Sequence, residues 1–214
     1  MDFNVLEILQ SGPDDWNQWR KSHPSSLVEL IGADLRNADL CYIELEAADL
    51  SFANFSDANL SFANFSNANL RLASLKDAQL ISTNFIGADL SGADLKGANL
   101  TKTNISESTK MDPKWRLVYQ IVNRGGQESN MSGADLAGAN LIDANLSQAN
   151  LSNSSLIGAN LCGANLIDAN LSGALLIGAD LTGTDLTNAD LTNAKLRNAT
   201  ITKATKIDMQ WLRA

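Results

Sequence analysis

Residues able to carry catalysis or bind a metal are scarce in this sequence. It has a single histidine, His23, and two cysteines, Cys41 and Cys162, whereas a structural zinc site needs about four such ligands at short spacing. Aspartates are abundant, but asparagine replaces them freely along a regular spacing, and acid–base catalysis needs one specific carboxylate with a tuned pKa. Regularly spaced glycines, such as Gly87 and Gly92, lack the lysine of a phosphate-binding loop. We therefore predict no catalytic, metal or cofactor site and no enzyme activity.

A five-residue repeat sets the position of almost every side chain. From Leu35 to Ile105 every fifth residue is Leu, Phe or Ile, and Ala stands two residues before it in 12 of 15 units. The same repeat runs from Leu136 to Ile201 in 14 further units, again with Ala in 12. Asp or Asn stands between them in most units, so the unit reads Ala-Asp/Asn-Leu-x-x. We call the Leu, Phe or Ile of each unit its central residue.

A period of five residues fits neither a helix nor a flat strand. On an α-helix, five residues advance by about 500°, so successive central residues would spiral around the whole surface. In a strand, side chains alternate with a period of two, so successive central residues would lie on opposite faces. Ala and the central residue can both face inward only if the chain turns a corner in every unit. Such a chain coils into a solenoid, whose units bury their apolar residues by stacking.

The units Ala33-Asp34-Leu35, Ala98-Asn99-Leu100 and Ala164-Asn165-Leu166 match, as they stand, the motif of the pentapeptide-repeat proteins. The chain resembles this family over about four-fifths of its length. The resemblance implies an all-β solenoid, a right-handed quadrilateral β-helix with four units per coil and about eight coils. The helical start of the chain and the segment 112–115 resemble cyanobacterial members of the family.

Breaks in the repeat divide the chain into five predicted segments. These are an N-terminal helical cap (1–29), repeat block one (30–108), an inserted helix and loop (109–128), repeat block two (129–204) and a C-terminal terminator (205–214). Short helices are predicted only near residues 3–10, 13–21 and 113–123. The cap is expected to cover the open end of the first coil, which would otherwise expose central residues and strand edges. The alternative is that the two N-terminal helices dock a partner protein.

The insertion is predicted to form an amphipathic helix. Pro113 favours a helix start, and Gly125 and Gly126 favour a stop. Four apolar residues between them are spaced for one helical face: Trp115, Val118, Ile121 and Val122. That face either folds back onto the solenoid or docks the groove of a partner protein. The segment that opens the insertion, 109–115, has an echo in 205–211, so we predict that both blocks end in the same terminator.

Several outward positions carry bulky apolar residues. Tyr42 and Phe62 stand one predicted coil apart at equivalent corners of block one, so they are expected to stack on one face. Outward positions of block two include Ile142, Ile157 and Ile177, and the last two are again one predicted coil apart. Two interpretations stay open: side chains stacked along the solenoid, or a binding patch for a protein.

Net charge and composition limit the partners and the compartment. A formal charge of −8 disfavours direct nucleic-acid binding through phosphates. The sequence shows no basic, apolar leader and no run of about 20 apolar residues, so neither secretion nor membrane insertion is expected. Two cysteines too far apart in the predicted coils to form a disulfide suit the reducing cytoplasm. The expected oligomeric state is a monomer or a weak dimer.

Two functions remain compatible with these features. The first is a non-enzymatic protein-interaction scaffold, of unknown partner, that binds through flat solenoid faces and the inserted helix. The second follows from the resemblance, because some family members mimic DNA and bind type II topoisomerases such as gyrase. Block two supports mimicry with seven acidic residues and no Lys or Arg between Gly125 and Ala194. A basic stripe at Arg36, Lys76 and Lys96 argues against it, so the scaffold is favoured.

Overall fold

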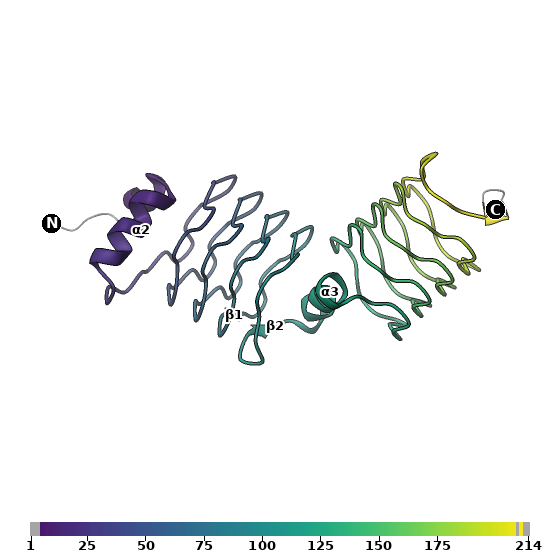
Figure 1. Cartoon of the computed structure of the whole chain (residues 1–214), viewed down its shortest axis with the longest axis horizontal. Helices are drawn as coiled ribbons and strands as arrows, with labels where there is room; N and C mark the ends of the chain where they lie inside the picture. Colours follow the sequence, from purple (N-terminus) through teal and green to yellow (C-terminus); the bar gives the residue numbers. More distant parts are fainter. Residues whose placement is uncertain (1–4, 209, 212–214) are drawn as a thin grey trace. The chain divides into compact units, whose positions relative to one another are not determined.

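The backbone completes one coil with every four repeat units, as the family resemblance implies. The computed structural model describes residues 5–208, 210 and 211. Parallel bridges join residues one coil apart, for example Asp34 to Asn54 in block one and Asn140 to Asn160 in block two. Both blocks are right-handed quadrilateral β-helices. Figure 1 shows the stacked coils of each block from the side. The chain forms two compact units, Met1–Trp115 and Arg116–Ala214, which are described separately.

Each five-residue unit closes one corner of a coil. Leu35 N–H donates to the Asn54 carbonyl of the next coil at 2.8 Å, and Asn54 N–H donates to the Ala33 carbonyl at 2.8 Å. The corner itself is held by a bond from Ala38 N–H to the Leu35 carbonyl, 3.3 Å. Except at the last unit of each block, it requires a left-handed backbone at the second residue after the central one, as at Asn37 with a φ of 57°. Asn, Asp and Gly tolerate that conformation, which explains their frequency at these corners.

The interior of each block is a narrow apolar column. Leu95 and Leu161, both predicted to be buried central residues, are 1% and 0% exposed. Central phenylalanines stack within block one, where the Phe65 and Phe85 rings lie 5.5 Å apart at an angle of 11°. Ala residues occupy most of the other inward positions, because a small side chain leaves room for the bulky central one.

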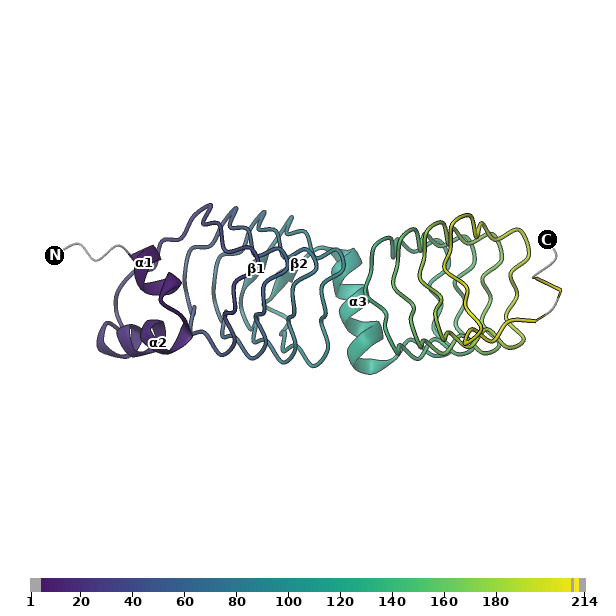
Figure 2. The same cartoon turned by 90° about the horizontal axis from the view of Figure 1, so that it is seen from above.

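Two helices lie at the N-terminal end of block one (Figure 2). They are α1, Val5–Gln10, and α2, Pro13–Ser22, so the predicted helices are confirmed where they are described; residues 3 and 4 lie outside the described part. The Trp16 side chain of α2 is fully buried, and its indole N–H donates to the Glu44 carbonyl at 2.7 Å. Asn17 accepts from Glu44 N–H and donates to the Tyr42 carbonyl, both at 2.9 Å. The amide of Asn17 thus holds α2 against a coil corner.

Block one ends in a short parallel sheet. Strand β1, Asp89–Leu90, pairs with β2, Lys110–Met111, and α3, Pro113–Arg124, follows at once. A regular coil would pair Asp89 with Thr109, but its partner is Lys110, so the terminator adds one residue to the last coil. None of the helices in the described part of the chain is long and apolar enough to cross a membrane.

Candidate interaction surfaces

Tyr42 and Phe62 form an exposed stacked pair on block one. Their ring centroids lie 4.8 Å apart with an angle of 8° between the planes. The side chains remain 61% and 48% exposed. The stack confirms the predicted alignment of these two residues, and it leaves one aromatic face open to solvent.

The stacked pair occupies a strained backbone position. Tyr42 and Phe62 have φ values of 62° and 61°, in the left-handed region that bulky residues rarely adopt. Phe52 and Leu72 adopt φ values of 61° and 57° half a coil away, and they are 61% and 52% exposed. Each such residue costs about 1 kcal/mol or more relative to Gly or Asn. Block one therefore keeps four bulky apolar side chains exposed on corners that most other units fill with Asn, Asp or Gly.

A flat apolar face lies on block two, and we call it the aliphatic face. Its members are Ala137, Ile157, Leu175 and Ile177. Ile157 is 41% exposed, and Leu175 and Ile177 are half-buried. Leu175 was missed in the sequence, although Gly173-Ala174-Leu175-Leu176 shows that Leu replaces the Asp or Asn usual at this place in the unit.

Ile142 lies on a face of block two next to the aliphatic face. It is 45% exposed, and the backbone beside it pairs with Cys162 of the next coil through a bond from Asp143 N–H to the Cys162 carbonyl. Cys162 and Cys41 are both free thiols and half-buried. Burial raises the pKa of the Cys41 thiol, and the nearby Asp39 carboxylate adds to this effect, so Cys41 is a weaker nucleophile than an exposed cysteine.

The predicted apolar face of α3 is covered rather than free. Trp115, Val118 and Ile121 are 7%, 1% and 2% exposed, and Val122 is half-buried. Ile121 lies against the first coil of block two, because the side chains of Ile121, Met131 and Leu146 crowd around Gly126. A Cβ added to Gly126 would stand 3.4 Å from Ile121 Cγ1, 3.3 Å from Met131 Cε and 2.8 Å from Leu146 Cδ2. Three of the four residues of the predicted face are therefore buried, whereas Val122 stays partly accessible.

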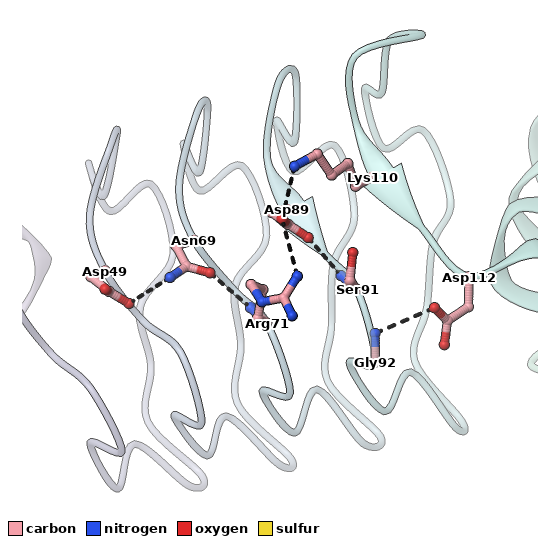
Figure 3. A network of polar contacts seen from close by, with 8 residues as sticks. All are labelled: Asp49, Asn69, Arg71, Asp89, Ser91, Gly92, Lys110 and Asp112. Carbon is pink, nitrogen blue, oxygen red and sulfur yellow. Dashed lines mark hydrogen bonds and ion pairs between the residues drawn. The ribbon is translucent and has the colours of Figure 1, made fainter.

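A polar network runs along successive coils of block one, from Asp49 to Lys110 (Figure 3). Asn69 donates to Asp49 Oδ1 at 3.0 Å and accepts from Arg71 N–H at 3.3 Å. The Arg71 guanidinium lies 3.6 Å from Asp89 Oδ2, and Lys110 Nζ donates to the same oxygen at 3.2 Å. Burial of Asp89 opposes its ionisation, but hydrogen bonds from Ser91 and Lys110 outweigh that effect and lower its pKa to about 2.

The last coil of each block is closed by an aspartate, a threonine and a lysine, and we call this set the end clamp. Its members are Asp89, Thr109 and Lys110 in block one, and Asp185, Thr205 and Lys206 in block two. Thr109 Oγ1 donates to the Phe85 carbonyl at 2.8 Å, and Thr205 Oγ1 donates to the Leu181 carbonyl at 2.6 Å. The hydrogen bonds that Asp185 accepts from Lys206 and Thr187 hold its pKa below the usual value. Both clamps use their polar groups to close a coil.

Family comparison agrees with this architecture. Pentapeptide repeats match in eight copies, over residues 29–61, 73–109, 129–166 and 164–202. The chain belongs to the pentapeptide-repeat family. No curated protein sequence matches it. Among the described residues, no three His, Cys, Asp or Glu side chains come together as metal ligands would.

Several solved structures are similar to this chain in sequence. HetL, a pentapeptide repeat protein involved in heterocyst differentiation regulation from the cyanobacterium Nostoc sp. strain PCC 7120, is 28% identical, with 86% of this chain and 92% of that chain covered and a TM-score of 0.41. QnrB1, a plasmid-mediated fluoroquinolone resistance protein, is 20% identical, with 87% and 91% covered and a TM-score of 0.35. Rfr23 from the cyanobacterium Cyanothece 51142 is 22% identical, with 90% and 97% covered and a TM-score of 0.25.

Proposed function

We propose that this chain is a non-enzymatic scaffold that binds a partner protein through the corners of block one. The observation that carries the proposal is the set of four exposed, bulky apolar side chains at left-handed corners, of which Tyr42 and Phe62 form a stack. Aromatic side chains bury a large area with few rotatable bonds, and they dominate the binding energy of protein interfaces. An open aromatic stack supplies such an anchor.

Backbone strain supports recognition over mere stacking. A corner residue has no steric need for an aromatic ring, because Ser82 holds the same corner one coil beyond Phe62 with a φ of 57°. Strained residues persist where something other than stability retains them, and they cluster at binding sites. The Tyr42 backbone is also held in place by α2, whose Asn17 donates to its carbonyl. The stack therefore lies on a part of block one whose backbone is fixed by a hydrogen bond from α2.

DNA mimicry is the less favoured function. Several carboxylates are already neutralised by cations of the same block: Arg36 lies 2.6 Å from Asp34, and Lys206 lies 2.7 Å from Asp185. A gyrase supercoiling assay tests this alternative directly, because a mimic would inhibit the enzyme or protect it from a quinolone. We place the scaffold in a reducing compartment, since both of its cysteines are free thiols.

The test of the scaffold is selective loss of binding. Immobilised wild type and the double variant Tyr42→Asn/Phe62→Asn are exposed to extract of the source cells, and retained proteins are compared. Asn fits the left-handed corner, so the variant should stay folded while it loses the partner by at least about tenfold. Ser82→Asn, in the same column, is the matched control and should retain the partner. Equal capture by all three proteins would contradict the proposal.

A further inference from the structure

Among the described residues, no further coil stacks on the last coil of block two, which is made of residues 187–206 (the yellow end of the chain in Figure 1). Inside the block, each side of a coil is bonded to the next coil through two backbone groups. The Ala174 carbonyl accepts from Lys195 N–H, and Leu176 N–H donates to the Lys195 carbonyl, both at 2.9 Å. The last coil presents the same two kinds of group, but without a following coil to bond them.

Two adjacent sides of the last coil have unpaired backbone groups. On the first side, these groups are the Ala194 carbonyl and Leu196 N–H. On the second side, they are the Ala199 carbonyl and Ile201 N–H. None of the four makes a hydrogen bond in the part of the chain that the structure describes. Such a row of alternating acceptors and donors is a template for an added strand.

The apolar column of block two is open at the same place. One coil earlier, Ala174 and Leu176 are both 0% exposed. Ala194 and Leu196, which stack on them, are half-buried, and Ile201 is 38% exposed. A strand added here would therefore bury apolar side chains as well as pair the backbone.

The first coil of block one shows how a coil end is closed. There the N–H of Glu44 donates to the side chain of Asn17 in α2, and the Glu44 carbonyl accepts from the Trp16 indole. Trp16 itself is fully buried. Side chains of a helix thus satisfy the backbone of the first coil, whereas the described residues supply nothing equivalent at Ala194 and Leu196.

The two open sides are basic. Lys195 and Arg197 are exposed on the first side, Lys203 is exposed just after the second, and no other Lys or Arg occurs in block two. None of the three forms an ion pair within the described ranges. Asp190 lies on the side of the coil that precedes them. Charge complementarity therefore favours an acidic occupant.

Two other occupants fit these features less well. The last coil of a second copy would bring like charges together, and the first coil of a second copy is covered by its own α2. A nucleic acid has phosphates for the cations, but its phosphate backbone has no N–H to donate to the Ala194 and Ala199 carbonyls. An extended protein segment supplies both carboxylates and peptide groups.

We propose that the last coil of block two binds an extended acidic segment of a partner protein, which adds as a parallel strand along residues 194–201. One residue of that segment donates to the Ala194 carbonyl and accepts from Leu196 N–H, as Lys195 does for the coil before it. Its carboxylate then lies beside Lys195, and its two neighbours cover Ala194 and Leu196. The recognised pattern is small, acidic, bulky apolar, which is the pattern of the repeat itself.

The chain already contains such a contact with the charges exchanged. Lys206 N–H donates to the Thr184 carbonyl at 2.9 Å, and the Lys206 carbonyl accepts from Leu186 N–H at 2.7 Å. The ammonium nitrogen of the same lysine lies 2.7 Å from Asp185 Oδ2. The end clamp thus shows that backbone pairing and an ion pair fit together across one coil spacing. In the proposed site the lysine belongs to the coil and the carboxylate to the partner.

The test uses a peptide probe in an NMR titration of the full chain. The probe is acetyl-Gly-Ala-Asp-Leu-Ser-Gly-Ala-Asp-Leu-amide, which has the sequence of residues 87–95. It should shift the backbone amide signals of Leu196 and Ile201 with a Kd of roughly 0.1–2 mM, because one short strand buries little area. A peptide with Lys in place of both Asp residues should bind at least about fivefold more weakly. Equal binding of the two peptides would overturn the proposal.

N-methylation of both Asp nitrogens of the probe tests the strand itself. It removes the N–H groups that would donate to the Ala194 and Ala199 carbonyls, and it retains the negative charge. The N-methylated peptide should no longer shift the signals of Leu196 and Ile201. If it shifted them as the parent peptide does, the contact would be electrostatic only, and the added strand would be overturned.

Charge reversal tests the position of the site. Lys195→Glu/Arg197→Glu should weaken binding of the acidic peptide by about tenfold and should bind the lysine peptide more tightly than wild type does. Lys76→Glu is the matched control, at an exposed position in the middle of block one, and should change the Kd by less than about twofold. Circular dichroism verifies that both variants remain folded. Equal weakening by the two variants would overturn the proposal.

The site is separate from the proposed scaffold surface on block one. Tyr42→Asn/Phe62→Asn should therefore bind the acidic peptide as wild type does, so that either proposal can fail without the other. Two further outcomes would overturn the strand site. One is tighter binding of an oligothymidylate than of the acidic peptide at the same amides. The other is self-association through this end, seen without peptide as broadening of the Leu196 and Ile201 signals that increases with protein concentration.

Discussion

Lys110 reaches back across one coil to place its ammonium nitrogen 3.2 Å from Asp89 Oδ2. Lys206 does the same to Asp185 at 2.7 Å, and each lysine stands one residue further along the chain than a regular coil would place it. Each block thus ends with a coil that is one residue longer than the others and is closed by a lysine–aspartate ion pair. The echo between 109–115 and 205–211 has a structural meaning where it is described: it encodes the end clamp.

The Asp89 clamp should make stability depend on acid. Its folded pKa of about 2 lies below the ordinary value of 3.8, so ionised Asp89 stabilises the folded chain above about pH 4, and that stability is lost as the pH falls towards 2. Asp89→Asn should lose on the order of 1–2 kcal/mol at pH 7, allowing for screening of the exposed Lys110 and Arg71.

Urea unfolding of wild type and Asp89→Asn at several pH values measures this effect. The difference between the two proteins should shrink as the pH falls from 4 to 2. Asp57→Asn, at an exposed corner outside the clamp, is the control and should stay within about 0.5 kcal/mol of wild type. Equal stability of Asp89→Asn and wild type at pH 7 would show that the clamp contributes nothing.

Thr109 should be the least replaceable member of the first clamp. Its buried hydroxyl donates to the Phe85 carbonyl at 2.8 Å and accepts from Ser106 N–H at 3.0 Å. Thr109→Val leaves both groups without that partner and should cost about 1–3 kcal/mol, measured as a loss in the free energy of unfolding. Thr101→Val, at an exposed position, should change stability by less than about 0.5 kcal/mol. If both variants lost similarly little free energy of unfolding, the Thr109 hydroxyl would not be an important part of the clamp.

Ser154 should behave in the opposite way. Its hydroxyl is fully buried in block two and has no hydrogen-bond partner, whereas Thr184 at an equivalent inward position donates to the Leu161 carbonyl at 2.7 Å. Ser154→Ala removes an unsatisfied polar atom, so thermal unfolding should show equal or higher stability, by up to about 1–2 kcal/mol. Thr184→Val should instead be destabilised by about 1 kcal/mol. A clear loss of stability in Ser154→Ala would mean that its hydroxyl has a partner, such as a buried water.

The repeat predicted the coil, its four-unit period through the family resemblance, and the burial of Leu95 and Leu161, because local spacing determines which residues turn inward. It also predicted the three helices from Pro, Gly and apolar spacing. These features depend on residues close together in the sequence, so their pattern is visible there.

Features that depend on distant residues escaped prediction. Asn17 binds Tyr42 and Glu44, and Leu175 joins Ile157 in one apolar surface, only because the coils bring them together. The helical face at Trp115 and Val118 was visible in the sequence, but its burial was one of two open outcomes. Which surface covers an apolar face is decided by tertiary packing, which periodicity does not encode.

The central claim is that Tyr42 and Phe62 are retained for recognition at the expense of stability. The direct measurement is the free energy of unfolding of Tyr42→Asn/Phe62→Asn. Asn relieves two left-handed corners at about 1 kcal/mol each, while loss of the stack costs about 0.5–1.5 kcal/mol, so the account predicts a variant within about 1 kcal/mol of wild type or more stable. A loss of more than about 2 kcal/mol would show that the rings hold the solenoid together, and it would contradict the account.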